Sequence, residues 1–178
     1  GGRVTGGAGG PVGGGAGGVR RGVPGRGCRE VLGRRLASRE TDYDGRRMPG
    51  RGDEVLMDDP IGVEQAMVRT TISPGLLETF GVNTNYEMPQ RIFEVGNISL
   101  LDDAAETGAR EVRLATAGAT GPRVDYSDIR AACEALLADL GWSLRTERDD
   151  APCSNPGRGA RLMATPHAGG DARRVGPV

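Results

Sequence analysis

The sequence contains no lysine, and its 23 basic side chains are all arginine. This absence excludes Schiff-base chemistry on a lysine and the lysine of a phosphate-binding P-loop. Aromatic residues make up only 3% of the chain and glycines number 31, so we expect a core in only part of the length. No apolar run approaches the length of a membrane span, and the first residues lack the apolar core of a signal peptide. A cytoplasmic protein with no membrane partner is therefore expected.

Cysteine and histidine are also scarce. Cys28, Cys133 and Cys153 are far apart and form no Cys-x-x-Cys pair, and their odd number argues against a disulfide framework. His167 is the only histidine and lies beside Pro166 in a glycine-rich tail, where nothing nearby would orient it as a catalytic base.

Metal binding is not indicated either. Acidic residues form adjacent pairs, whose side chains diverge in extended backbone instead of converging on a cation. These pairs are Asp58–Asp59, Asp102–Asp103 and Asp149–Asp150. We therefore expect no catalytic, cofactor-binding or metal-binding residue on this chain.

The charges are distributed unevenly. Residues 1–52 hold eleven arginines against four acids, residues 53–150 hold eight against nineteen, and residues 151–178 hold four against one. Residues 1–27 are a low-complexity tract with too little apolar surface to offset the ordering of glycine, so we expect disorder there. Gly13, Gly15 and Gly18 match a dinucleotide-binding pattern, but such a match is nearly inevitable in this tract. The arginines could contact RNA phosphates, which leaves an Arg/Gly-rich RNA-binding protein as an alternative.

Two helices are predicted from periodicity and capping. Pro74 suits the first turn of a helix that Ser73 would cap, with Leu76, Leu77 and Phe80 on one apolar face. The other helix starts at Asp125 or Ser127 and ends at Gly141. Its buried stripe is predicted to be Ile129, Cys133, Leu136, Leu137 and Leu140.

Strands are predicted between and after these helices, at residues 54–57, 91–101, 111–119, 142–147, 158–164 and 173–178. A short helix is expected within residues 28–40. Several strands follow one another with only loops between them, so the sheet should be mainly antiparallel or mixed and the fold class α+β.

Arg69 and Arg91 are the candidate binding residues, because each lies at an element boundary beside apolar sequence. An arginine there can clamp a phosphate or carboxylate with two hydrogen bonds. The alternative is a framework ion pair with Glu94 or Glu64. Along a strand, Arg91 and Glu94 face opposite sides and cannot form an acid–base pair across one site.

The stretch "DDPIGVEQAMVRTTISPGLLETFGVNTNYEMPQRIFEVG" resembles the archaeal form of the phenylalanyl-tRNA synthetase beta subunit. The resemblance is carried by the order and spacing of short motifs. These are Asp59–Pro60, Arg69–Thr70, Ser73 to Leu77, Asn83 and Phe93 to Gly96. Three further segments also look like the family: "LASRE", "VDYSDIRAACEALLADLG" and "NPGRGARL". The similarity spans about residues 28–176 and is strongest in 53–142.

This resemblance implies an antiparallel sheet with flanking helices of the class II synthetase type, as a catalytic-like module without active-site residues. It implies a structural part of phenylalanine–tRNA ligase that packs against the catalytic alpha subunit in an α2β2 enzyme acting on tRNA(Phe). ATP and Mg belong to the holoenzyme, and this chain carries no cofactor. The motif residues then have a structural or interface role: Arg69, Thr70, Pro74, Arg91, Phe93, Glu94 and Gly96. Glu94 is expected to meet Arg69, and Arg91 to form a pair or face the subunit boundary.

Residues 1–27 match nothing in the family pattern, and residues 28–176 end before a strand that the family would supply next. We therefore expect a truncated module at 28–176, and a non-functional gene fragment with frame-shifted ends is a further alternative. An independent class II enzyme is disfavoured, because the sequence lacks a second, glycine-flanked arginine motif and an acid/arginine ATP pocket.

Overall fold

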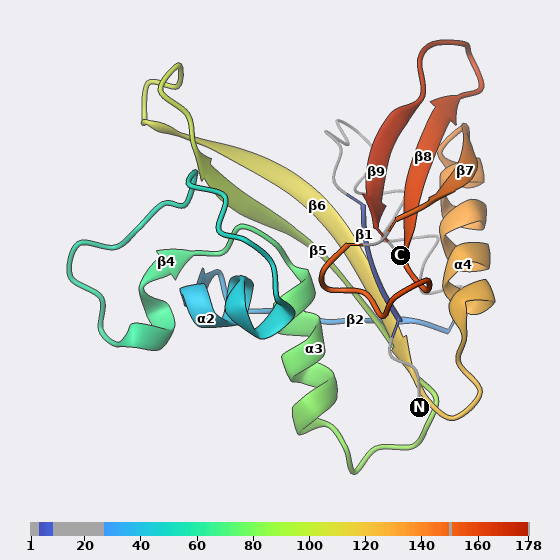
Figure 1. Cartoon of the computed structure of the whole chain (residues 1–178), viewed down its shortest axis with the longest axis horizontal. Coiled ribbons are helices and arrows are strands. Elements are labelled where there is room, and N and C mark those ends of the chain that lie inside the picture. Colours follow the sequence, from blue (N-terminus) through green and yellow to red (C-terminus); the bar gives the residue numbers. More distant parts are fainter. Residues whose placement is uncertain (1–3, 9–26, 150, 178) are drawn as a thin grey trace.

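The computed structural model describes residues 4–8, 27–149 and 151–177, with the backbone alone at 4–8 and 175–177. Its centre is a four-stranded sheet in the order β1-β6-β5-β2 (Figure 1). The strands are β1 (Val4–Ala8), β2 (Arg29–Glu30), β5 (Gln90–Leu101) and β6 (Ala109–Thr120). β2 runs parallel to β5, and the other pairings are antiparallel, as expected for a mixed sheet.

The β5–β6 hairpin is the longest feature of the sheet, with twelve residues in each strand. Its loop is closed by a hydrogen bond from the Asp102 N–H to the Gly108 carbonyl, and Gly108 has a φ of 69°. Glycine takes this left-handed conformation without steric cost, which explains its place at the turn. The predicted strands 91–101 and 111–119 and the loop between them are confirmed.

α3 (Ser73–Val82) covers one face of this sheet. Leu76 and Phe80 are buried there against alternate β5 residues, including Ile92 and Ile98. The helix is confirmed, but its predicted cap is wrong. Ser73 is already the first helical residue, and Ile72 occupies the cap position without a side-chain hydrogen bond.

α4 (Tyr126–Asp139) covers the opposite face, where Leu136 and Leu140 pack against Phe93 and Val95. Asp125 caps it reciprocally with Asp128, and Gly141 has a φ of 79° just after its end. The predicted helix and its stop are thus confirmed. Within the predicted stripe Ile129 is buried and the other four residues are half-buried.

A second sheet follows α4, with strands β7 (Trp142–Arg148), β8 (Ala160–Pro166) and β9 (Arg173–Pro177) in that order. All its pairings are antiparallel. Leu162 and Leu144 point toward α4 and the β6 residue Ala119, forming a shared core. The three strands predicted in this part of the sequence are confirmed.

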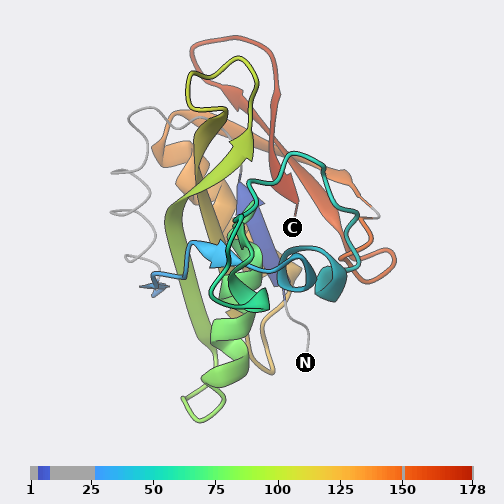
Figure 2. The same cartoon turned by 90° about the vertical axis from the view of Figure 1, so that its left-hand side faces the viewer.

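A small layer lies on the side of the molecule where β4 and α2 are labelled in Figure 1. It consists of the two-residue strands β3 (Leu36–Ala37) and β4 (Met67–Val68), the helix α2 (Arg39–Asp42) and the short 3-10 turns η2 (Asp44–Arg46) and η3 (Val63–Gln65). Figure 2 shows this layer in front of the central sheet.

Three local predictions are wrong. The helix expected within residues 28–40 is mostly extended, because β2 pairs with β5 and the Val31 N–H donates to the Phe93 carbonyl. Pairing with a distant strand overrides local propensity here. The strand expected at 54–57 is reduced to two isolated bridges, from Glu54 to Leu100 and from Leu56 to Met67.

The third correction concerns only Val4–Ala8, within the segment 1–27 for which disorder was expected; for the rest of that segment the expectation stays a prediction. Val4–Ala8 forms strand β1 and pairs with Ala115 to Ala119 of β6. Strand pairing uses backbone groups, so a glycine-rich segment with few apolar side chains can still join a sheet edge. Most of that segment lies outside the described residues.

Candidate functional site

A buried ion pair joins β5 to the residue that follows β4. The Arg69 Nη1 atom lies 2.7 Å from Glu94 Oε1, and the two side chains are 6% and 2% exposed. Glu94 is on the β5 face that packs toward α3, as are Ile92 and Ile98. The expected contact between Glu94 and Arg69 is confirmed.

The pair is completed by backbone groups. Arg69 donates from Nε to the Asn97 carbonyl at 3.1 Å and from Nη1 to the Arg34 carbonyl at 3.3 Å. The Gly33 N–H donates to Glu94 Oε2 at 3.1 Å. Buried charges are tolerated only when their hydrogen-bonding capacity is used in this way. The guanidinium is therefore committed to contacts within the protein.

Two glycines make room for the pair. A Cβ atom at Gly96 would lie 2.2 Å from Arg69 Nη2, and one at Gly33 would lie 2.8 Å from Glu94 Oε2. Neither distance is compatible with a side chain unless the charged groups move. Glycine at position 96 of the motif is thus explained by steric exclusion beside the ion pair.

Thr70 extends the buried polar cluster toward α2. Its N–H and its hydroxyl both donate to Asp42 Oδ2, at 2.8 and 3.1 Å, and its hydroxyl also lies 2.9 Å from the Tyr43 hydroxyl. Asp42 and Tyr43 are only 1% and 2% exposed. The neighbouring motif residues Arg69 and Thr70 therefore anchor the two halves of one network.

Burial raises the pKa of Asp42 above its ordinary value of 3.8, although the hydrogen bonds from Thr70 and the charges of Arg46 and Arg69 oppose the rise. For Glu54, burial acts in the same direction. Backbone N–H groups of Glu54 itself, Gly52 and Arg51 more than offset it, so the pKa of Glu54 lies below its ordinary value.

The other motif residues have framework positions. Pro74 is buried in the first turn of α3, and Phe93 is buried against α4. Arg91 lies on the α4 side of β5, opposite Glu94 as expected, with Nη2 3.8 Å from Asp128 Oδ1. Arg91 thus forms a partly exposed pair, and its role at a subunit boundary stays a prediction.

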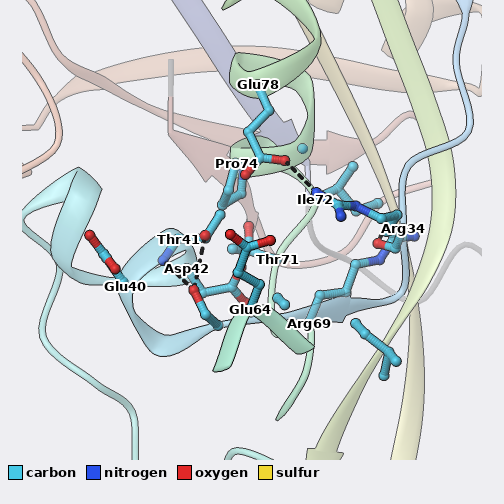
Figure 3. Close-up of a pocket in the computed structure, with 14 residues that line it drawn as sticks. Arg34, Glu40, Thr41, Asp42, Glu64, Arg69, Thr71, Ile72, Pro74 and Glu78 are labelled. Carbon is cyan, nitrogen blue, oxygen red and sulfur yellow. Dashed lines mark hydrogen bonds and ion pairs between the residues drawn. The ribbon is translucent and has the colours of Figure 1, made fainter. Parts of the chain in front are cut away.

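A cavity of about 280 Å³ opens beside this network at the start of α3. Figure 3 shows Arg69 and Asp42 at its wall, with Glu40 and Glu64 around them. Arg34, also in the wall, pairs with Glu78 at 3.7 Å. The acids in this wall outnumber the arginines, and both arginines already have carboxylate partners, so the cavity does not offer an open clamp for phosphate.

Sequence reasoning did not identify Asp42, Tyr43, Gly33 or Glu54. Asp42 and Tyr43 stand in a polar segment, "SRETDYD", whose pattern is that of any exposed turn. The burial of both side chains depends on contacts with Thr70, which follows Asp42 by 28 positions. The threonine beside the candidate arginine was the one available signal.

Among the described residues, no group of three or more His, Cys, Asp or Glu side chains is arranged to hold a metal ion. Of the helices in that part of the chain, none has the length and apolarity needed to cross a membrane.

Comparison with known proteins decides the family. Residues 13–176 match the family described as the phenylalanyl tRNA synthetase beta chain CLM domain. The chain belongs to this family. The match begins within the tract that was expected to match nothing, which corrects that expectation for residues 13–27.

The curated relatives that match the chain carry the name of the same subunit. The chain is 36% identical over 150 residues to the phenylalanine–tRNA ligase beta subunit of Methanopyrus kandleri, covering 83% of this chain and 24% of that protein. It is 31% identical over 154 residues to the same subunit of Thermococcus kodakarensis, covering 78% of this chain and 27% of that one. The chain therefore spans about a quarter of the length of these relatives.

A solved structure supports the fold. The chain is similar to a pyrrolysyl tRNA synthetase from Desulfitobacterium hafniense, PylSc, with a TM-score of 0.59 and 14% identity over 90% of this chain and 60% of that one. The mixed α/β architecture of this domain is thus shared with a tRNA synthetase.

Removing one partner of the Arg69–Glu94 pair should destabilise the fold strongly. We expect Glu94→Gln to lower the free energy of unfolding by about 3–5 kcal/mol, because it leaves a buried guanidinium without its counter-charge. The double variant Arg69→Met/Glu94→Leu should cost less than the sum of its two single changes. Urea unfolding compares the unmodified protein with Glu94→Gln, with the single variants Arg69→Met and Glu94→Leu and with the double variant. Strictly additive costs in the double variant would contradict the pairing. Glu111→Gln, in an exposed pair with Arg35, is the control and should change little.

Gly96→Ala should also destabilise the domain, by about 1–3 kcal/mol, since the added methyl group displaces Arg69 or Glu94. Gly81→Ala in α3 is the matched change, because nothing lies within 4 Å of a Cβ there. Replacing that helical glycine should be neutral or stabilising by roughly 0.5–1 kcal/mol. Equal thermal melting of the two variants would refute the steric role of Gly96.

Asp42 should make stability depend on pH. Its pKa is raised in the folded state, so folding favours the protonated acid, and this contribution is lost as pH rises from 3.8 through the raised value. Asp42→Asn cannot ionise but can still accept from Thr70, so its free energy of unfolding should not show this decline. Urea titrations between pH 3.5 and roughly 7 compare the two proteins. If the free energy of unfolding of both proteins falls in parallel as pH rises, Asp42 is not the cause of the decline. Asp44→Asn, at the exposed neighbouring residue, is the control and should keep the pH dependence of the unmodified protein.

Proposed function

We propose that this domain is a structural, non-catalytic part of phenylalanine–tRNA ligase that supports the catalytic alpha subunit. The observation that carries the proposal is the closed Arg69–Glu94 pair. The buried arginine of the motif uses its Nε and Nη1 donors on Glu94 and on two backbone carbonyls, so these donors hold the framework instead of clamping a phosphate or carboxylate of a substrate.

The core supports the same proposal. The α3 face of the sheet is largely filled by apolar side chains, among them Leu76, Phe80 and Ile98, and the Glu94 carboxylate on that face is paired with Arg69. The buried acids Asp42 and Glu54 are held by hydrogen bonds within the chain. These features favour a scaffold over a reacting site.

The holoenzyme would follow the α2β2 arrangement in the cytoplasm, with ATP, Mg and phenylalanine bound by the alpha subunit and tRNA(Phe) as the acceptor. The name of the matching family and the names of the curated relatives support the beta-subunit part of this proposal. The alternative of an Arg/Gly-rich RNA-binding protein depends on the basic flanks, and salt-dependent RNA binding by residues 1–52 alone, which hold eleven arginines, would favour it.

Co-purification tests this function. A tagged alpha subunit of phenylalanine–tRNA ligase should retain this chain through size-exclusion chromatography, whereas the chain alone should give no ATP–pyrophosphate exchange with phenylalanine. Retention with no exchange by the isolated chain is the expected result. Exchange by the chain alone would overturn the scaffold role, and elution of the two proteins in separate peaks would overturn the partnership.

A further inference from the structure

An anchored loop projects from the small layer into solvent. Its base is fixed by hydrogen bonds from the Val68 N–H to the Val55 carbonyl and from the Met57 N–H to the Ala66 carbonyl, each 2.9 Å long. The Leu56–Met67 bridge lies between them. In Figure 1 the loop that leads to β4 forms the outer margin of this side of the molecule. The tip, residues 58–65, is therefore held at both ends while its side chains face outward.

The tip and its base present apolar side chains to water. Ile61 is 97% exposed, Val63 84% and Leu56 68%. Scattered exposed apolar residues are ordinary, but three within eight residues of one anchored loop concentrate apolar surface of the kind that marks a protein interface. We call Leu56, Ile61 and Val63 the apolar knob.

The charge around the knob indicates its partner. Residues 53–66 contain five acids and no arginine. Glu54 is buried and Asp53 pairs with Arg51, which leaves Asp58, Asp59 and Glu64 beside the knob. Such a rim repels the phosphates of RNA and attracts a cationic surface.

We propose that the apolar knob docks into an apolar groove with a basic rim on the alpha subunit. This inference rests on the proposed function, since it assigns that partner to a particular surface. Burial of Ile61 and Val63 supplies the binding energy, and the three carboxylates steer and orient the encounter.

Binding of the full 178-residue chain to immobilised alpha subunit tests the surface. Ile61→Asp/Val63→Asp should weaken binding on the order of 30-fold or more, as expected for a central apolar anchor. Both side chains are almost fully exposed, so the circular-dichroism spectrum should not change. The milder Ile61→Ala/Val63→Ala pair should weaken binding in the same direction. Val82→Asp/Tyr86→Asp is the matched control, because these residues form a separate exposed apolar patch at the end of α3.

Neutralising the rim with Asp58→Asn, Asp59→Asn and Glu64→Gln should slow association and flatten its salt dependence. Unchanged binding of the knob variants, or an equal loss in the control, would overturn the proposal while the function stands. A knob-dependent dimer of this chain, or RNA binding that the knob changes abolish, would also overturn it. If the unmodified chain does not bind the alpha subunit at all, the proposed function itself fails.

Discussion

The buried pair between Arg69 and Glu94 is the interaction on which the arrangement of this domain depends. Two opposite charges removed from water are stable only where geometry and backbone hydrogen bonds compensate both of them. Here the compensation comes from two separate segments, through Gly33 and Arg34 in the loop after β2 and through Asn97 in β5. The central strand β5, the loop after β2 and the residue after β4 must therefore be in place together before the pair can form. The pair thus fixes the small layer against the central sheet, and the adjoining Thr70 carries the same constraint to Asp42 in α2.

This constraint also bears on chemistry. An arginine at a strand boundary could serve either as an anion clamp or as framework, and the two roles compete for the same donors. In this domain the Nε and Nη1 donors of Arg69 serve the framework role. Because position 96 is a glycine, no side chain there displaces the Arg69 guanidinium, and the largely apolar α3 face leaves few polar groups beside it. In this domain, whose fold is shared with a tRNA synthetase, the central charged pair is internal.

Sequence patterns were informative where the determining interactions are local. Periodicity and capping predicted α4 and its end at Gly141, and strand parity placed Arg91 and Glu94 on opposite faces of β5. Sequence patterns failed to predict the structure where contacts between segments far apart in the sequence determine it. The helix expected within residues 28–40 does not form where residues 29–31 pair with β5, and Val4–Ala8 joins β6 through backbone groups that composition does not reveal. Asp42 was missed for the same reason, because its burial depends on Thr70 and not on its own neighbours.

The structure separates the carboxylates of the acidic middle of the chain, residues 53–150, into buried and exposed groups. Its buried carboxylates, Glu54 and Glu94, are satisfied internally, so they add nothing to the field at the surface. The exposed acids near the projecting loop do contribute to that field, and they accompany apolar side chains instead of cations. A surface of this composition is poorly suited to a polyanion and well suited to a protein with a basic rim. Contacts with RNA by the described residues must therefore come from other faces, while the loop before β4 is the part of the domain whose chemistry fits a protein partner.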